Sequence, residues 1–324
     1  MNRKLVAITD LDHADIKRQQ EVLWKHNIDP VWLNCRTEDD LIDQCKGFKA
    51  LINQYAPFTE KVFAALPDLR MIVRFGVGVD NIDLKSATRH NVKICNVPDY
   101  GTQEVADHAI GLLLCLSRKI IHNFEDIKSG IWEYHRVSPI YRHSEQTVGI
   151  IGVGRIGTAF AFRAKAFGFN IIVNDEAKRK ANKLQDFMIH VELDELLKQA
   201  DIVSIHIPLD GNHNLIDYEK LHLMKKNAFL VNVSRGGIVN EDDLYRALSE
   251  GLIAGGACDV FKNEPLDKHN PLLQSKNFIA TSHIAWYSEQ SCVDLEVKVA
   301  EEAVRGALDQ ELLNVVNRDT KGPG

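Results

Sequence analysis

The chain has 324 residues, enough for two domains at the usual ~100–200 residues each. Apolar residues make up 45% of it and charged residues 26%, a mixture typical of a globular protein. The formal net charge of −6 argues against general binding to nucleic acid or to anionic lipid, and no apolar run approaches the ~18 residues of a membrane span.

Cysteine and histidine usage predicts a reduced protein without a metal ion. The six cysteines form no C-x-x-C pair, and most of them lie in apolar runs. We therefore expect buried thiols and a cytoplasmic location, where disulfides are rare. The 13 histidines show no H-E-x-x-H or comparable ligand spacing, so no metal site is expected.

Short β-branched runs alternate with helical stretches along the whole chain, which indicates an α/β fold with parallel sheets. In the first hundred residues the pattern predicts strands at 5–9, 30–34, 50–53, 71–75 and 92–95. An apolar helix is expected over 102–121. A second series of strands follows at 147–151, 170–174, 201–206, 228–233, 253–258 and 277–281, and an amphipathic helix over 288–313 closes the chain.

A glycine loop stands between the first strand of the second series and a helix. Its sequence is Gly152-Val153-Gly154-Arg155-Ile156-Gly157, and the next strand ends at Asp175. In such a unit the glycines allow a tight turn, a close approach by a pyrophosphate, and close packing of the helix, whose N-terminus attracts phosphate. Asp175 is placed to bind the adenosine ribose and to repel a 2′-phosphate, which favours NAD over NADP. The alternative is a plain strand–helix turn with Asp175 on the surface and Arg155 in water.

Three polar residues follow later strands of this second series: Arg235, Glu264 and His283. Ligands of open α/β sheets bind beyond the carboxyl ends of the strands, so these side chains are expected to lie together. Histidine is a natural proton donor near neutral pH, a carboxylate on its far nitrogen would favour imidazolium, and a guanidinium fits a substrate carboxylate. Taken singly, each has an ordinary alternative: a helix-cap ion pair, an exposed turn residue or a satisfied core histidine.

These motifs resemble the D-isomer-specific 2-hydroxyacid dehydrogenase family, whose members have an Arg–Glu–His set in this chain order. The matching segments are Val233-Ser234-Arg235-Gly236-Gly237, Asp259-Val260-Phe261 with Glu264-Pro265, His283, residues 76–83, Asn96-Val97-Pro98 and residues 105–108. They span roughly residues 70–290 in order. Within the family, residues 285–290 and 163–170 resemble the branch of the C-terminal-binding proteins and their bacterial relatives.

The resemblance implies an α/β fold of two doubly wound parallel-sheet domains, with a Rossmann NAD domain inserted into a flavodoxin-like substrate domain. We expect the substrate domain at 1–99, the NAD-binding domain at 100–287, and a return to the substrate domain with a C-terminal tail at 288–324. The implied reaction is hydride transfer between the nicotinamide of NAD and C2 of a small 2-oxo acid. In it, His283 is the general acid/base, Glu264 orients it, and Arg235 binds the substrate. The family also implies a homodimer.

The expected cofactor contacts are Gly152, Gly154, Arg155, Ile156, Gly157, Asp175, His206, Pro208, Val233 and Asp259. The expected substrate contacts are Val77, Gly78, Arg235, Tyr55, Arg74 and Trp286. Among these, the turn at Val77 and Gly78 would offer adjacent backbone N–H groups to a carboxylate, or it is only a tight turn. Asp259 is alternatively a structural acid at a strand end, and Trp286 a core aromatic.

Two other functions remain open at this point. The first is an NAD(H)-sensing corepressor-like scaffold, which the short segment after His283, the lack of a basic targeting run and the complete catalytic set disfavour. The second is phosphoglycerate dehydrogenase, which performs the same chemistry on a phosphorylated substrate. The length leaves no room for a regulatory domain, and no second arginine cluster for a phosphate is evident. The sequence does not identify the 2-oxo acid.

Overall fold

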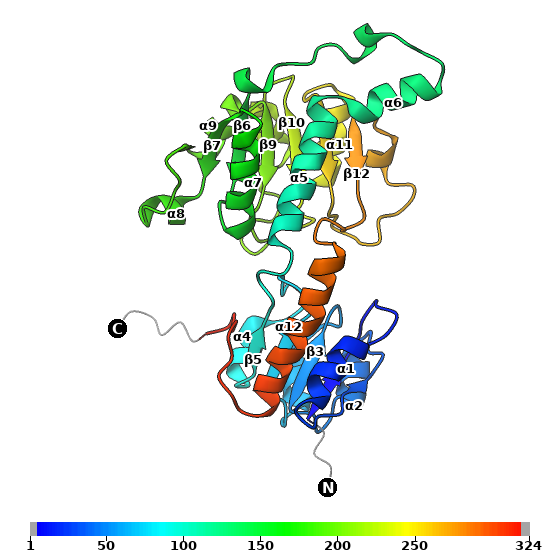
Figure 1. Cartoon of the computed structure of the whole chain (residues 1–324), viewed down its shortest axis with the longest axis vertical. Helices are drawn as coiled ribbons and strands as arrows, with labels where there is room; N and C mark the ends of the chain where they lie inside the picture. The colour runs from blue at the N-terminus through cyan, green and yellow to red at the C-terminus, as the bar shows by residue number, and fades with distance from the viewer. Residues whose placement is uncertain (1–4, 319–324) are drawn as a thin grey trace. The chain divides into compact units, whose positions relative to one another are not determined.

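The computed structural model describes residues 5–318, and the last residues of the expected tail, 319–324, lie outside this range. The chain divides into two compact units (Figure 1). Unit 1 contains residues 1–101 and 288–324, and unit 2 contains residues 102–287. Among residues 5–318, no helix is both long enough and apolar enough to cross a bilayer.

Unit 1 is built on a five-stranded parallel sheet in the order β2-β1-β3-β4-β5. This order is the doubly wound, flavodoxin-like one. The strands are β1 (Val6–Ile8), β2 (Val31–Trp32), β3 (Ala50–Asn53), β4 (Met71–Arg74) and β5 (Lys93–Cys95). The helices are α1 (Lys17–Trp24), α2 (Glu38–Gln44), α3 (Glu60–Ala65), α4 (Leu84–Arg89) and α12 (Glu289–Ala307).

Helices cover both faces of this sheet, which is why its central strands read as continuous apolar runs. On one face α2, α3 and α4 bury a cluster that includes Leu51 and Ile72. On the other face α12 packs against β3 and β4, with α1 beside it (Figure 1). The approach is close, because a Cβ at Gly306 of α12 would lie 2.2 Å from the Met71 side chain.

Unit 2 is built on a seven-stranded parallel sheet in the order β12-β11-β10-β9-β6-β7-β8. The strands are β6 (Thr147–Ile151), β7 (Asn170–Asn174), β8 (Met188–His190), β9 (Ile202–Ile205), β10 (Phe229–Asn232), β11 (Gly255–Cys258) and β12 (Phe278–Ala280). The helices are α5 (Thr102–Ser117), α6 (Ile120–Lys128), α7 (Arg155–Ala166), α8 (Glu176–Lys180), α9 (Leu193–Gln199), α10 (Tyr218–Leu223) and α11 (Glu241–Ser249). Short 3-10 turns lie at η1 (Tyr134–Val137), η2 (His143–Glu145) and η3 (Pro271–Gln274).

The layers of unit 2 confirm the doubly wound Rossmann arrangement expected from the sequence. Helices α5 and α7 bury one apolar cluster against the sheet, and α9, α10 and α11 bury another on the opposite face (Figure 1). Strand β6 pairs with β9 on one side and β7 on the other, so the strand order reverses beside β6. In such sheets ligands bind beyond the carboxyl ends of the strands at this switch point.

The structure differs from the expectations in two helices and one strand. The helix expected over 102–121 is two helices, because Lys119 has a left-handed backbone (φ 54°) that separates α5 from α6. The closing helix ends at Ala307 rather than at residue 313, and Asp309 just after it is also left-handed (φ 55°). Strand β8 was not expected, since it is three residues long and pairs only with β7.

Candidate active site

The glycine loop joins β6 to α7 and requires glycine at particular positions. Gly152 has a φ of +85°, a conformation that side chains disfavour. A Cβ at Gly157 would lie 2.0 Å from the carbonyl oxygen of Gly152, so only glycine permits this packing of helix on turn. At Gly154, the N-cap of α7, a Cβ would have no neighbour within 4 Å. A phosphate group therefore has open access to the start of the helix, and the loop fits a dinucleotide.

Asp175 ties this loop to the neighbouring helix. Its Oδ2 accepts a hydrogen bond from the Val153 backbone N–H at 2.9 Å, and its Oδ1 accepts one from the Lys178 N–H at 2.9 Å. A carboxylate has further lone pairs, so it can also accept from ribose hydroxyls. Arg155 and Ile156 lie in the first turn of α7, with Arg155 exposed.

His206, Pro208 and Val233 follow the ends of β9 and β10. The His206 ring packs on Phe160, with 4.9 Å between ring centroids, and its Nε2 lies 2.9 Å from the Ser204 hydroxyl. Burial lowers the pKa of His206 to about 3, so the ring is neutral. His206 also lies against the loop, because a Cβ at Gly157 would be 3.3 Å from its Cβ. Pro208 is exposed and Val233 buried.

His283 and Glu264 form a directly bonded pair. Nδ1 of His283 lies 2.6 Å from Oε2 of Glu264, and Oε1 of Glu264 accepts from the Phe261 backbone N–H at 2.8 Å. Burial by itself would raise the pKa of Glu264, but His283, the Phe261 N–H and the Arg235 charge outweigh it and lower this pKa. The pairing leaves Nε2 of His283 away from Glu264, on a side chain that is 42% exposed.

Arg235 lies just beyond β10, on a loop that packs tightly against the Glu264 loop. Asn232 holds this loop by donating to the Arg235 carbonyl at 2.9 Å, and Nη1 of Arg235 donates to the Ser234 carbonyl at 2.8 Å. A Cβ at Gly236 would lie 1.9 Å from the backbone carbon of Phe261, so glycine is required for the approach. Because this loop contacts the Glu264 loop, and Glu264 contacts His283, the three expected catalytic residues gather at one end of the sheet.

Asp259 organises the segment that contains His283. It is 1% exposed, and its carboxylate accepts hydrogen bonds from Thr281 Oγ1 (2.5 Å) and from the backbone N–H groups of Ile284 (3.0 Å) and Ala285 (2.9 Å). The Asp259 carbonyl accepts from the His283 N–H at 2.8 Å. These bonds hold His283 in a left-handed conformation (φ 56°), a strained state typical of functional sites. These contacts are those of a structural acid at a strand end, the alternative that the sequence left open for Asp259.

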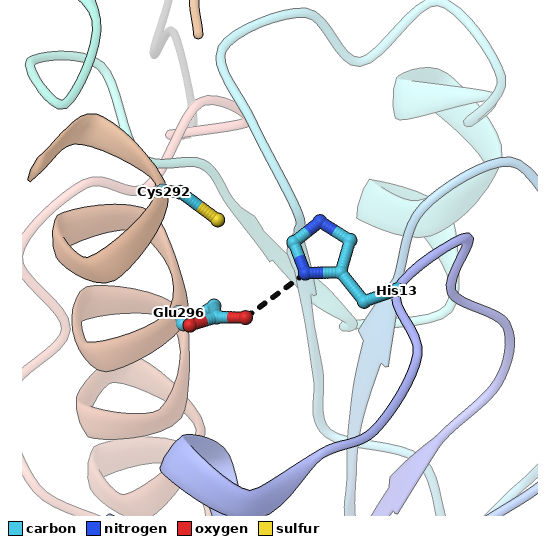
Figure 2. A group of neighbouring side chains, drawn as sticks. All are labelled: His13, Cys292 and Glu296. Carbon is cyan, nitrogen blue, oxygen red and sulfur yellow. Dashed lines mark hydrogen bonds and ion pairs between the residues drawn. The ribbon is translucent and has the colours of Figure 1, made fainter. Parts of the chain in front are cut away.

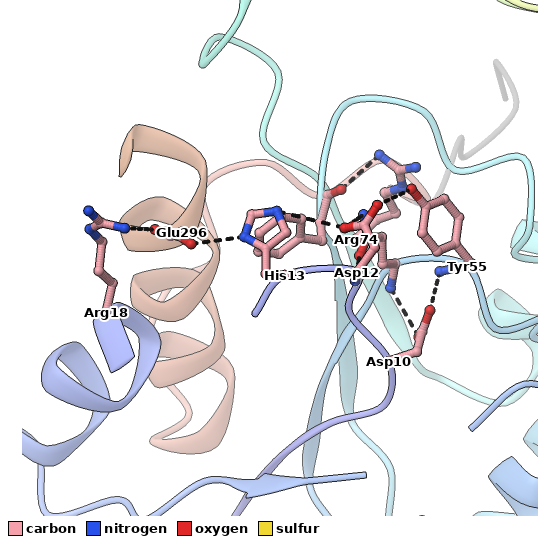
Figure 3. Close-up of polar contacts among 9 residues, drawn as sticks. Asp10, Asp12, His13, Arg18, Tyr55, Arg74 and Glu296 are labelled. Carbon is pink, nitrogen blue, oxygen red and sulfur yellow. Dashed lines mark hydrogen bonds and ion pairs between the residues drawn. The ribbon is translucent and has the colours of Figure 1, made fainter. Parts of the chain in front are cut away.

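The expected substrate contacts belong to both units. Val77 and Gly78 lie in a turn after β4, where Asn96 donates to the Val77 carbonyl at 2.6 Å. Tyr55 and Arg74 lie at the carboxyl ends of β3 and β4 (Figure 3). Tyr55 donates from its hydroxyl to Asp12 at 2.9 Å, and Nη1 of Arg74 donates to the Phe75 carbonyl at 2.8 Å. Trp286 belongs to unit 2 and meets the Tyr287 ring edge-on at 5.5 Å.

Comparisons of the sequence with a family model and with curated proteins agree with one another. The model of the D-isomer specific 2-hydroxyacid dehydrogenase NAD binding domain matches residues 110–285. A glyoxylate reductase from Korarchaeum cryptofilum is 35% identical over 310 residues, covering 93% of this chain and 92% of that protein. A D-3-phosphoglycerate dehydrogenase from Methanocaldococcus jannaschii is 37% identical over 288 residues, or 87% of this chain, which spans about half (54%) of that relative's length.

Solved structures agree with the sequence relatives. A D-lactate dehydrogenase from Aquifex aeolicus, complexed with NAD and lactic acid, superposes with a TM-score of 0.84 at 28% identity. The match covers 98% of this chain and 100% of that one. The likeness therefore extends over both units and includes both sheets.

Proposed function

The chain belongs to the D-isomer-specific 2-hydroxyacid dehydrogenase family of NAD-dependent oxidoreductases, and we propose that it reduces a small 2-oxo acid with His283 as proton donor. The observation that supports this most is the 2.6 Å contact between His283 Nδ1 and Glu264 Oε2 beside the Arg235 loop. A carboxylate on one ring nitrogen favours imidazolium, which leaves the other nitrogen as an acid.

NADH bound at the glycine loop would supply the hydride that reduces C2 of the substrate. As negative charge builds on the carbonyl oxygen, Nε2 of His283 donates a proton to it, and the product is the 2-hydroxy acid. Glu264 stabilises the imidazolium beforehand and keeps the ring oriented. Arg235 binds the substrate carboxylate through its planar fork of N–H groups and polarises the carbonyl. In the reverse direction Nε2 of His283 takes the proton back.

In this proposal the two units have different roles, one in binding NAD and the other in binding the substrate. Unit 2 is the NAD-binding domain, with Gly152, Gly154 and Gly157 next to the pyrophosphate and the remaining expected cofactor contacts around it. Unit 1 is the substrate domain, where the turn at Val77 and Gly78 offers backbone N–H groups to the substrate carboxylate. Their expected boundaries are 1–99, 100–287 and 288–324.

Replacing Asp175 with alanine is expected to raise the NADPH-to-NADH ratio of kcat/KM by roughly 10- to 100-fold, because a carboxylate near the ribose repels a 2′-phosphate. Alanine also removes the helix cap at the Lys178 N–H, so it is expected to lower Tm. Asp175→Asn keeps a capping group without the charge and is expected to give the same change in selectivity with a smaller loss of Tm. Unchanged selectivity in both variants would limit Asp175 to its structural role.

A homodimer is supported by exposed apolar side chains in and after α6. Ile120, Phe124, Trp132 and Tyr134 are 52%, 58%, 87% and 76% exposed. By contrast, the apolar residues of α5 are mostly buried in the core of unit 2, so the candidate interface lies after residue 119. Light scattering is expected to give twice the monomer mass, and Phe124→Asp with Trp132→Ser is expected to give the monomer.

The cysteines are consistent with the cytoplasmic location proposed from the sequence. All six are free thiols, and Cys35, Cys45, Cys95 and Cys258 are buried. Buried free thiols persist best in a reducing compartment.

The substrate is tested with a panel of 2-oxo acids and NADH, monitored as loss of nicotinamide absorbance. The panel contains glyoxylate, hydroxypyruvate, pyruvate and bulkier 2-oxo acids, and the products are resolved into D and L forms. We expect turnover of at least one member to a D product. 3-Phosphoglycerate with NAD is included because of the Methanocaldococcus relative. NADH binding without turnover of any member would contradict the proposal and favour the scaffold of the C-terminal-binding-protein type.

A further inference from the structure

Unit 1 contains a cluster of three chemically reactive side chains that the proposed reaction does not use: His13, Cys292 and Glu296 (Figure 2). His13 lies in the loop after β1, while Cys292 and Glu296 lie one turn apart on α12. One ligand atom from each residue lies within 4.8 Å of the others. All three belong to the same unit, so this convergence depends only on the fold of unit 1.

The donor set is a mixed one. Imidazole nitrogen, thiolate sulfur and carboxylate oxygen are the three ligand types that Zn²⁺ accepts, whereas Mg²⁺ and Ca²⁺ require oxygen. Residues four apart on a helix face the same side, so Cys292 and Glu296 can bind one ion without distorting α12. With a thiolate and a carboxylate, a divalent ion would be neutralised.

Two of the three side chains are held by a second layer of partners (Figure 3). Oε1 of Glu296 lies 2.9 Å from Nδ1 of His13, and its Oε2 accepts from Arg18 at 2.7 Å. On the far side of the ring, Nε2 of His13 lies 3.8 Å from Oδ1 of Asp12. This distance is longer than a hydrogen bond, but the carboxylate lies on the side of the ring where a metal-ligating histidine usually has its outer partner.

The outer residue Asp12 and the His13 ring are themselves fixed by neighbouring side chains. Asp12 accepts hydrogen bonds from the Gln54 amide at 2.8 Å and from the Tyr55 hydroxyl at 2.9 Å. The Phe75 ring meets the His13 ring edge-on, with centroids 5.0 Å apart. Glu296 is only 5% exposed, so its charge is desolvated and requires positive partners.

We propose that His13, Cys292 and Glu296 bind Zn²⁺ through Nδ1, Sγ and Oε1, with a fourth position for water. The ion replaces the proton shared by His13 and Glu296, Cys292 binds as the thiolate and releases its proton, and Asp12 then accepts from Nε2–H of His13. The sequence predicted no metal because His13 and Glu296 are 283 residues apart, so no local spacing marks the site. Without a metal, the same residues form only an ion-pair cluster with Arg18.

The test uses the full-length protein, reduced with a phosphine, stripped with a chelator and titrated with Co²⁺ and then Zn²⁺. The wild-type protein is expected to show a thiolate-to-cobalt charge-transfer band, which Zn²⁺ abolishes by displacing Co²⁺. Cys292→Ser is expected to lose the band and to weaken Zn²⁺ binding by at least 100-fold. Asp12→Asn is expected to keep the band and to weaken binding by about 10- to 100-fold, as loss of an outer partner does.

Two control variants separate this site from other ligands in the chain. Cys115→Ser removes a comparably half-buried thiol from α5 and is expected to leave the band unchanged. A second cluster, Glu176, His190 and Glu192, contains no thiol, so His190→Gln is also expected to leave the band unchanged. Absence of the band in the wild-type protein, or its persistence in Cys292→Ser, would overturn the proposal and leave the ion-pair cluster.

Discussion

Replacing His283 with alanine is expected to lower kcat for 2-oxo acid reduction by about 10²- to 10⁴-fold, because the variant lacks the group that donates the proton. The dissociation constant of NADH is expected to change little, since the glycine loop and Asp175 remain. Steady-state kinetics measures the first effect, and NADH fluorescence measures the second. Backbone changes around residue 283 are expected to be small, because alanine keeps the backbone N–H that donates to the Asp259 carbonyl.

The matched control is His222→Gln, which replaces an exposed histidine on α10 of the same unit. It is expected to retain wild-type kcat and Tm. If His283→Ala reduced the affinity for NADH by as large a factor as kcat, or lowered Tm by several degrees, His283 would have a structural role instead. Glu264→Gln is expected to reduce kcat less than His283→Ala does, because it removes only the partner of the acid.

Replacing Arg235 with glutamine is expected to lower kcat/KM for the 2-oxo acid by about 10²- to 10³-fold, the usual cost of losing one donor at a developing negative charge. Arg235→Lys is expected to recover only part of this loss, because lysine restores the charge but not the planar fork. Kinetics over a range of substrate concentrations separates the effect on KM from that on kcat.

The control for Arg235 is Arg142→Gln, because the Arg142 side chain is 78% exposed in the same unit. This variant is expected to behave as the wild-type protein does. Wild-type kcat/KM in Arg235→Gln would contradict the role assigned to the guanidinium. Gly236→Ala provides a further comparison, since its Cβ would collide with the Phe261 backbone and displace the Glu264 loop.

Most of the fold could be predicted from the sequence because its signals are local. Apolar runs bounded by polar residues marked every strand except β8, and the glycine loop marked the β6–α7 turn. The errors lie where one residue changes the backbone direction, as Lys119 does between α5 and α6. Apolar periodicity continues through such a residue, so it does not reveal the break.

The sequence by itself determined the alternation of strands and helices, the glycine positions that permit the β6–α7 turn, and the residue types available for chemistry. Only the tertiary structure decided that Asp259 holds the His283 segment in a left-handed conformation and that His13 meets Glu296. The physical reason is the sequence separation over which each kind of signal acts. Turn and periodicity signals act over a few residues, whereas the meeting of two side chains depends on how distant elements pack.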